Sequence, residues 1–177
     1  LFGFVWAAMQ FLASPIVGAL SDRFGRRPVV LLSNFGLGLD YFVMAAATSV
    51  PWLFVGRMIS GITSSSYSTA SAYIADVPPA DERAGAFGLL GAAFGLGFII
   101  GPAVGGVLGD IDLRLPFWVA GGLSLANAAY GYFILPESLP PEKRARVPWH
   151  MANPLGSLTF LRAHPELLAL GATYFLY

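Results

Sequence analysis

Long apolar runs separated by short polar turns dominate this sequence. A helix needs roughly 20 apolar residues to cross the hydrocarbon core of a bilayer. Because the runs are this long and lack alternation with a period of two, we predict helices rather than strands. The pattern predicts five membrane-spanning helices, at about 1–20, 29–48, 51–75, 84–109 and 116–135, and the start of a sixth near residue 166.

The segment 136–165 differs from the runs around it. It is rich in proline and carries charges of both signs, which predicts a linker, extended in part, between two membrane bundles. The chain would then comprise an amino-terminal transmembrane bundle (1–135), a central cytoplasmic loop (136–165) and the start of a second bundle (166–177). His150 and His164 lie in or beside this loop, where we interpret them as solvated side chains rather than proton relays.

Composition supports a membrane protein. The chain is 56% hydrophobic and 11% charged, whereas a soluble domain carries about 25% charged residues. Its zero net charge argues against a nucleic-acid partner, and the absence of cysteine excludes disulfides and thiolate sites. No nucleophile–base pair, metal cluster or phosphate-binding loop is found, so we predict no enzyme, no cofactor and no bound metal. Leu1 and Tyr177 both lie inside apolar runs, as expected for a fragment of a longer chain.

The basic residues predict the orientation. Eight lie in turns on one side, and Arg114 alone lies on the other. By the positive-inside rule, the basic side faces the cytoplasm. Trp52 and Trp118 begin helices on the opposite side, as interfacial aromatic anchors do. The eight residues are Arg23, Arg26, Arg27, Arg83, Lys143, Arg144, Arg146 and Arg162.

A charged turn interrupts the first two apolar runs. Its sequence, from residue 18 to 27, is Gly-Ala-Leu-Ser-Asp-Arg-Phe-Gly-Arg-Arg. Gly18 would permit close helix approach, Gly25 would permit a turn with positive φ, and Asp22 could pair with an arginine. Arg23, Arg26 and Arg27 would hold the turn in the cytoplasm. A basic stop-transfer anchor, which only sets topology, is the alternative interpretation.

This turn resembles the signature loop between the second and third helices of the major facilitator superfamily of transporters. The resemblance implies that the chain has the fold of that superfamily, as helices two to six of the amino-terminal six-helix bundle, the central loop and the start of helix seven. It also implies that the loop is a latch on the cytoplasmic side. Asp76 and Arg83 flank another turn on that side, which we interpret as a second latch point.

Two segments repeat in order. Residues 14–22 and 101–110 share Pro, Val, Gly, Leu and Asp, allowing one inserted residue. The helices that they close are three apart, so they cross the membrane in opposite directions. This is typical of the inverted repeats of secondary transporters, although chance similarity between two Gly/Ala/Val-rich helices is the alternative.

Asp40 and Arg57 are charges inside predicted spans. Such charges cost several kcal/mol and are functional candidates. They are equally far in sequence from the turn near Thr48, so they lie at similar depth on antiparallel helices. The residues around Arg57 resemble the fourth-helix motif of proton-coupled drug exporters, which implies that Arg57 and Asp40 carry proton coupling. A structural ion pair is the alternative.

The fourth predicted helix carries a glycine at every fourth position. Gly97, Gly101, Gly105 and Gly109 make one smooth face for close packing, and Pro102 would bend the helix. The stretch from Gly97 through Gly106 resembles the fifth-helix motif found mainly in antiporters of the superfamily. In that motif, packing of the bent helix is the function.

Polar residues in two helices are candidates for substrate contact. They could line an aqueous cavity or equally hydrogen-bond between helices. They are Gln10, Ser64, Ser65 and Tyr67.

Several segments, including Gly18 to Arg27 and Leu39-Asp40-Tyr41, look like the bacterial tetracycline exporters. That resemblance implies export of an amphipathic, tetracycline-like drug across the bacterial inner membrane, driven by protons. A divalent metal would take part only as the ion that the drug chelates. The site would need the missing first helix and second bundle of the same polypeptide. Importers or facilitators of nutrients with this fold, and a membrane scaffold without transport, are the alternatives. Tyr67 stands where the exporters have small residues, so the substrate itself stays open.

Overall fold

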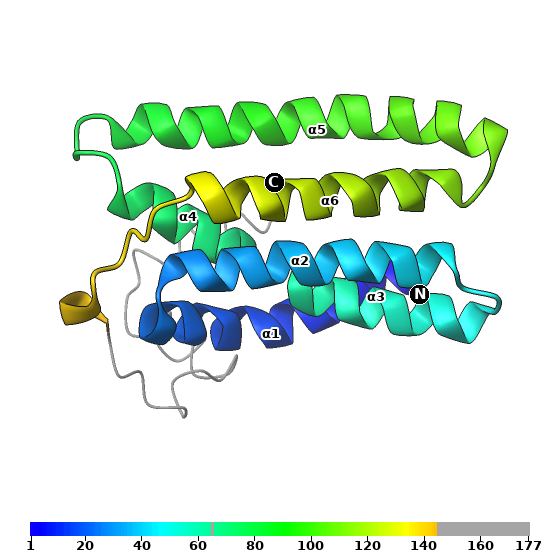
Figure 1. Ribbon diagram of the computed structural model, residues 1–177, viewed down its shortest axis with the longest axis horizontal. Helices are drawn as coiled ribbons and strands as arrows, with labels where there is room; N and C mark the ends of the chain where they lie inside the picture. The colour runs from blue at the N-terminus through cyan, green and yellow to red at the C-terminus, as the bar shows by residue number, and fades with distance from the viewer. Residues whose placement is uncertain (65, 145–177) are drawn as a thin grey trace.

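The described part of this computed structural model, residues 1–64 and 66–144, is helical. Its helices lie along a common direction and are joined by short turns (Figure 1). The elements are α1 (Phe2–Phe24), α2 (Arg26–Ala45), α3 (Val50–Thr63), α4 (Ser66–Asp76), α5 (Arg83–Ile111), α6 (Leu115–Ile134) and the short 3₁₀ helix η1 (Pro141–Lys143). The all-helical prediction is confirmed for these residues. Arg146, His150, Arg162, His164 and the predicted start of a second bundle lie outside them.

Local sequence explains several helix boundaries. Proline stands in the first turn of α3 and of α6, where its missing N–H costs no helical hydrogen bond. Gly25 separates α1 from α2 with φ at 108° and is the only residue with positive φ in the described ranges. The predicted turn at Gly25 is thus present, and it reverses the chain within one residue.

The predicted span 51–75 contains two described helices, which lie on either side of Ser65, a residue outside the described ranges. α3 ends at Thr63 and α4 begins at Ser66. At the end of α3, Thr63 Oγ1 donates to the carbonyl of Ile59 at 3.0 Å, and Ser64 Oγ donates to the carbonyl of Ser60 at 2.5 Å. Hydroxyls that bond the preceding turn compete with the backbone ladder and bend helices. These hydroxyl bonds therefore favour a bend at the end of α3.

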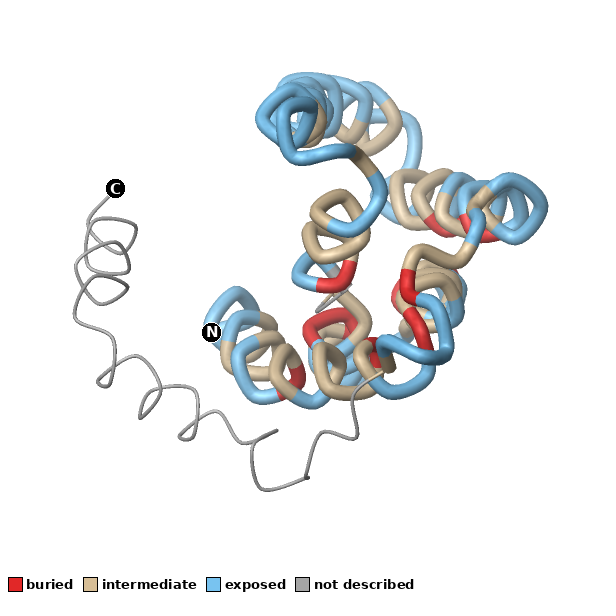
Figure 2. The backbone as a smooth tube through the Cα atoms, turned by 90° about the vertical axis from the view of Figure 1, so that its left-hand side faces the viewer, coloured by how far each residue is buried: buried red, intermediate tan, exposed pale blue. Residues whose placement is uncertain are grey.

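Glycines set the closest approaches between helices. A Cβ on Gly38 of α2 would lie 2.7 Å from Leu125 of α6, and one on Gly121 would lie 2.8 Å from the Phe42 ring. Along the seam between α2 and α6, side chains of one helix thus pack into the space left by glycines of the other. Figure 2 shows that the buried residues lie mainly on the sides of the helices that face one another.

A second close seam joins α1 to α3. A Cβ on Gly61 would lie 2.6 Å from the carbonyl oxygen of Trp6 and 2.7 Å from the Cβ of Met9. The two backbones therefore touch at this point. Both seams realise the small-residue packing typical of membrane helices.

α5 lies at the edge of the bundle and has no buried residue. Its neighbours are α6 and α4, and it runs opposite in direction to α1 (Figure 1). With α1 and α2, it is one of three described helices that are long and apolar enough to cross a membrane. Opposite directions are required by the predicted inverted repeat, which stays a prediction.

Candidate functional site

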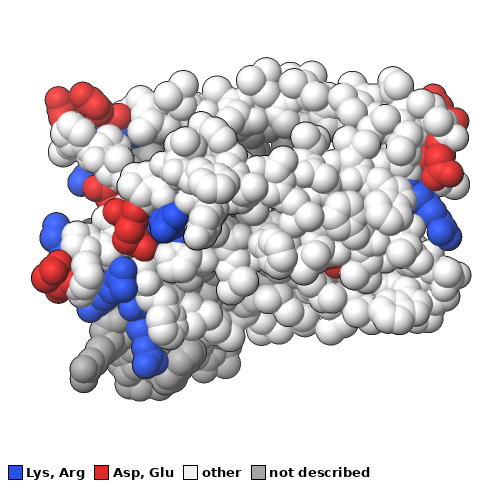
Figure 3. Space-filling model, in the orientation of Figure 1, with Lys and Arg blue, Asp and Glu red and all other residues white. Residues whose placement is uncertain are grey.

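Charges gather at the two ends of the bundle, and the surface between them is almost entirely uncharged in the view of Figure 3. We call one end the basic end. It comprises the α1–α2 turn, the end of α4, the start of α5 and the segment after α6. Its described basic residues are Arg23, Arg26, Arg27, Arg83, Lys143 and Arg144. Arg114 lies at the opposite end, where its guanidinium donates to the Ala47 carbonyl at 3.0 Å. This arrangement suits a molecule that crosses a bilayer.

Arg26 is the centre of an ion-pair network at the basic end. Its guanidinium pairs with Asp22 near the end of α1 and with Asp76 at the end of α4, where Nε lies 3.3 Å from Oδ2. It also donates to Ser21 Oγ at 2.7 Å, and Ser21 is fully buried. The arginine side chain is 13% exposed, so the pairs are partly shielded from solvent. The structure thus brings two of the predicted latch points, Asp22 and Asp76, onto one arginine.

The other predicted latch residues lie outside this network. Arg23 stacks over the Phe24 ring at 5.3 Å. Arg27 donates to the carbonyl of Tyr132 at 2.5 Å and lies 5.5 Å from its ring centroid. Arg83 is exposed at the start of α5 and joins none of the ion pairs in the described ranges.

Gly18 makes no close helix approach within the described ranges, so the approach that we predicted there stays a prediction. A Cβ there would meet nothing within 4 Å. The reason is that its α-carbon faces open space in the described part of the chain. Its carbonyl instead accepts the hydroxyl of Ser21 at 2.8 Å.

Glu137, which we did not single out in the sequence, binds the start of α2. Its Oε1 accepts the backbone N–H of Arg26 at 2.8 Å and of Leu139 at 3.1 Å. Oε2 lies 3.9 Å from the Arg144 guanidinium. In the sequence, Glu137 is marked only as an acidic residue just after the predicted helix 116–135. Its partner Arg26 lies 111 positions earlier, and the sequence around Glu137 does not indicate it.

Asp40 is buried in the middle of the described bundle at 1% exposure. A Cβ on Gly56 of α3 would lie 3.3 Å from its Oδ1, so the carboxylate lies close to α3 at this glycine. Neither oxygen has a hydrogen-bond partner within the described ranges. Arg57, the next residue on α3, attracts this carboxylate electrostatically, but no ion pair within 4.0 Å joins them there. This interaction agrees with the similar depth that we predicted for the two residues. The structural ion pair, which was the alternative interpretation, is not found in the described ranges.

The four candidates for substrate contact have different surroundings. Gln10 is half-buried on α1, where its backbone nitrogen would lie 3.4 Å from a Cβ on Gly61 of α3. The Ser64 hydroxyl bonds the α3 backbone. Tyr67 is 53% exposed on α4, with its ring 5.9 Å from that of Phe94 on α5. Ser65 lies outside the described residues. The structure therefore does not gather them into one described site.

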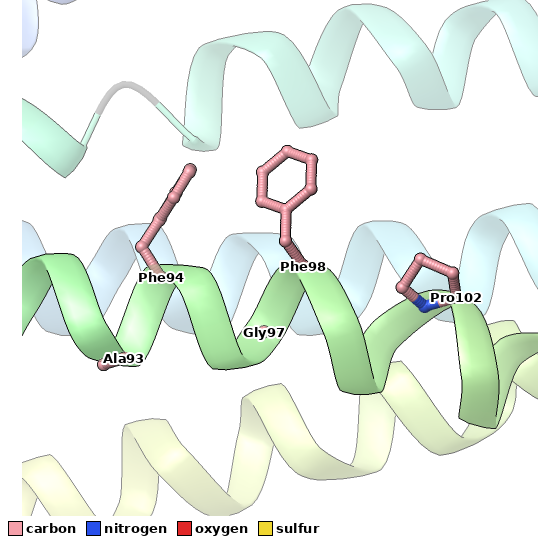
Figure 4. Close-up of a pocket in the computed structure, with 5 residues that line it drawn as sticks. All are labelled: Ala93, Phe94, Gly97, Phe98 and Pro102. Atoms are coloured by element: carbon pink, nitrogen blue, oxygen red, sulfur yellow. The ribbon is translucent and has the colours of Figure 1, made fainter.

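The glycine face of α5 lines two cavities. One, of about 400 Å³, is lined by Ala93, Phe94, Gly97, Phe98 and Pro102; Figure 4 shows that Phe94, Phe98 and Pro102 project on the same side of α5. The other, of about 370 Å³, lies between α5 and α6 and includes Gly101 and Gly105.

No close packing on this face is found within the described ranges. A Cβ on Gly97, Gly101, Gly105 or Gly106 would meet nothing within 4 Å. Within the described ranges, close packing is found at other glycines, on α2, α3 and α6, and packing of the α5 glycines stays a prediction.

Comparison with known proteins decides the family. The model of the major facilitator superfamily matches residues 1–177, the whole chain. The chain belongs to this superfamily. The resemblance noted in the charged turn is thereby confirmed.

Two bacterial relatives within the superfamily are tetracycline resistance proteins from Escherichia coli. The class C protein is 44% identical over 173 residues, which are 97% of this chain and 43% of that protein. The class B protein is 46% identical over 123 residues, which are 70% of this chain and 31% of that protein. The chain thus spans less than half the length of these relatives.

A solved superfamily structure has the same arrangement of helices. The crystal structure of the human organic anion transporter MFSD10 (TETRAN) matches with a TM-score of 0.77 and 34% identity. The match covers 85% of this chain and 35% of the human one. The predicted superfamily fold is therefore confirmed, and this chain is one part of it.

Proposed function

We propose that the full-length protein is a secondary active transporter that exports an amphipathic small molecule in exchange for protons by alternating access. One observation carries this proposal. Asp40 is buried at 1% exposure without a hydrogen-bond partner in the described ranges. An unpaired carboxylate inside a membrane is costly as an anion, so it favours a proton. A carboxylate near the positive charge of Arg57 can therefore bind and release a proton during transport.

The remaining candidates take the roles that the superfamily motifs imply. Gln10, Ser64, Ser65 and Tyr67 would contact substrate in a cavity that is completed by a first helix and second bundle of the same polypeptide. The turn from Gly18 to Arg27 would close the cytoplasmic side. The motif from Gly97 to Gly106 would pack in the assembled transporter. The protein would lie in a bacterial inner membrane, with the basic end in the cytoplasm.

The relatives favour two substrate classes. Two bacterial relatives are named for tetracycline resistance, which supports a tetracycline as its magnesium chelate. The human relative is described as an organic anion transporter, which supports an organic anion as the second candidate. The exposed Tyr67 ring beside Phe94 suits a flat, partly apolar molecule of either class.

Proton exchange can be measured with the full-length protein in everted membrane vesicles that have an acid interior. Addition of magnesium-tetracycline should release protons, reported by a pH-sensitive dye. Arg57→Ala should abolish release without changing membrane insertion, whereas the control Arg114→Ala, at the opposite end, should retain it. A signal from an organic anion alone would establish the second candidate. Loss of insertion in Arg57→Ala, or exchange that persists in it, would contradict the role given to Arg57.

A further inference from the structure

The carboxylate of Glu137 occupies the N-terminus of α2. Oε1 accepts the backbone N–H groups of Arg26 at 2.8 Å and Arg27 at 3.4 Å. The first N–H groups of a helix have no partner within the helix, and the helix dipole favours an anion beside them. Glu137 therefore caps α2 from the segment that follows α6.

The turn before α2 fits around this carboxylate. A Cβ on Gly25 would lie 2.3 Å from Glu137 Oε2, closer than any real contact. The positive φ of Gly25 already requires glycine. The absence of a side chain at Gly25 thus allows both the turn and the approach of the carboxylate.

The same segment reaches the end of α4. Tyr73 donates its hydroxyl to the Pro136 carbonyl at 3.1 Å, and Ser138 donates to Asp76 Oδ2 at 3.5 Å. Asp76 is also the partner of Arg26. Residues 136–139 therefore join the start of α2 to the end of α4.

We propose that Glu137 is a positioning residue for the latch. One guanidinium has to reach Asp22 and Asp76, which lie on different helices, so its direction depends on the backbone from which it projects. The carboxylate binds the N–H of Arg26 itself and so orients that backbone. The inference rests on the proposed transport function, because the latch has a role only in a transport cycle.

Amide hydrogen exchange tests the cap in the full-length protein reconstituted in lipid nanodiscs. Glu137→Ala should speed exchange of the Arg26 and Arg27 amides by about tenfold or more, as expected for loss of a hydrogen bond to a charged group. Glu137→Gln should have a smaller effect, because its amide oxygen still accepts hydrogen bonds. Glu142→Ala is the matched control, since Glu142 is an exposed glutamate in η1.

Transport kinetics test the consequence for the latch. In the proton-release assay, Glu137→Ala should lower the maximal rate severalfold at an unchanged KM, because no candidate substrate residue contacts Glu137 in the described ranges. Glu142→Ala should match the unmodified protein. A general folding defect would instead lower the amount of inserted protein or change both constants.

The outcomes separate the cap from transport. If the Arg26 and Arg27 amides exchange at the same rate in Glu137→Ala as in Glu142→Ala, the inference is overturned. It is also overturned if these amides exchange faster in Glu137→Ala while the maximal transport rate is unchanged. If Glu137→Ala fails to insert, Glu137→Gln decides both measurements. If the unmodified protein moves no compound, the proposed function fails, and the exchange data alone decide whether Glu137 caps α2.

Discussion

Replacing Gly61 by alanine should force α1 and α3 apart. The new Cβ would lie 2.6 Å from the Trp6 carbonyl oxygen and 2.7 Å from the Met9 Cβ, whereas non-bonded carbon atoms prefer about 3.5–4.0 Å. Neither neighbour is the end of a flexible side chain, so the clash cannot be relieved by a change of rotamer. The helices would have to separate by about 0.8 Å or more, and overpacking of this kind costs about 1–3 kcal/mol.

Gly122→Ala provides the matched control. It gains the same helix propensity, about 1 kcal/mol in water, but its Cβ would meet nothing within 4 Å. The difference between the two variants therefore isolates the clash at Gly61. In the purified full-length protein, we expect the unfolding midpoint of Gly61→Ala to lie about 2–10 °C below that of Gly122→Ala.

Size-exclusion chromatography after stepwise heating measures both midpoints. A midpoint for Gly61→Ala at or above that of Gly122→Ala would refute the close contact between α1 and α3. Equal losses in both variants would show that alanine is disfavoured for reasons other than this contact.

Two further predictions concern the basic end. Gly25→Ala should destabilise the full-length protein by about 1–3 kcal/mol in the same heating assay, because its backbone conformation strains any other residue. Gly18→Ala should cause no loss of stability, because Gly18 lies inside α1 and its Cβ is unobstructed. Equal losses in the two variants would contradict the geometry of the turn. A double-mutant cycle of Arg26→Ala and Asp76→Asn, measured by heating, should give a coupling free energy of about 1 kcal/mol. The coupling should weaken in high salt, because the Asp76 side chain is 30% exposed. Additive effects of the two substitutions would show that the ion pair contributes nothing to stability.

Local features of the sequence were enough to predict most helix ends. Predicted spans at 29–48 and 84–109 correspond to α2 (Arg26–Ala45) and α5 (Arg83–Ile111), because apolar length and flanking charge act within each segment. The end of α3 at Thr63 was not predicted, although the chain is polar from Thr63 to Thr69. The hydrogen bonds that the Thr63 and Ser64 hydroxyls donate at the end of α3 depend on side-chain rotamers. Hydropathy contains no information about rotamers.

Partners far apart in sequence were harder to predict. A regular glycine step pointed to α5 as the close-packing helix, yet Gly38, Gly61 and Gly121 make the close contacts. Spacing shows that a face is smooth but not which helix faces it. Likewise, Asp40 and Arg57 were expected at similar depth and do lie near each other. Depth alone could not show that the Asp40 carboxylate lies close to Gly56, or that no ion pair joins it to Arg57 in the described ranges.

By itself, the sequence determined that this chain is a helical membrane protein with one basic end and a glycine turn at position 25, because hydropathy, charge and φ preference belong to single residues and short segments. Only the tertiary structure decided that Glu137 caps α2 and that Arg26 binds both Asp22 and Asp76. These contacts join helices across up to 111 positions of sequence. They depend on how the helices pack in three dimensions, and pairing over such distances leaves no periodic signal in one chain.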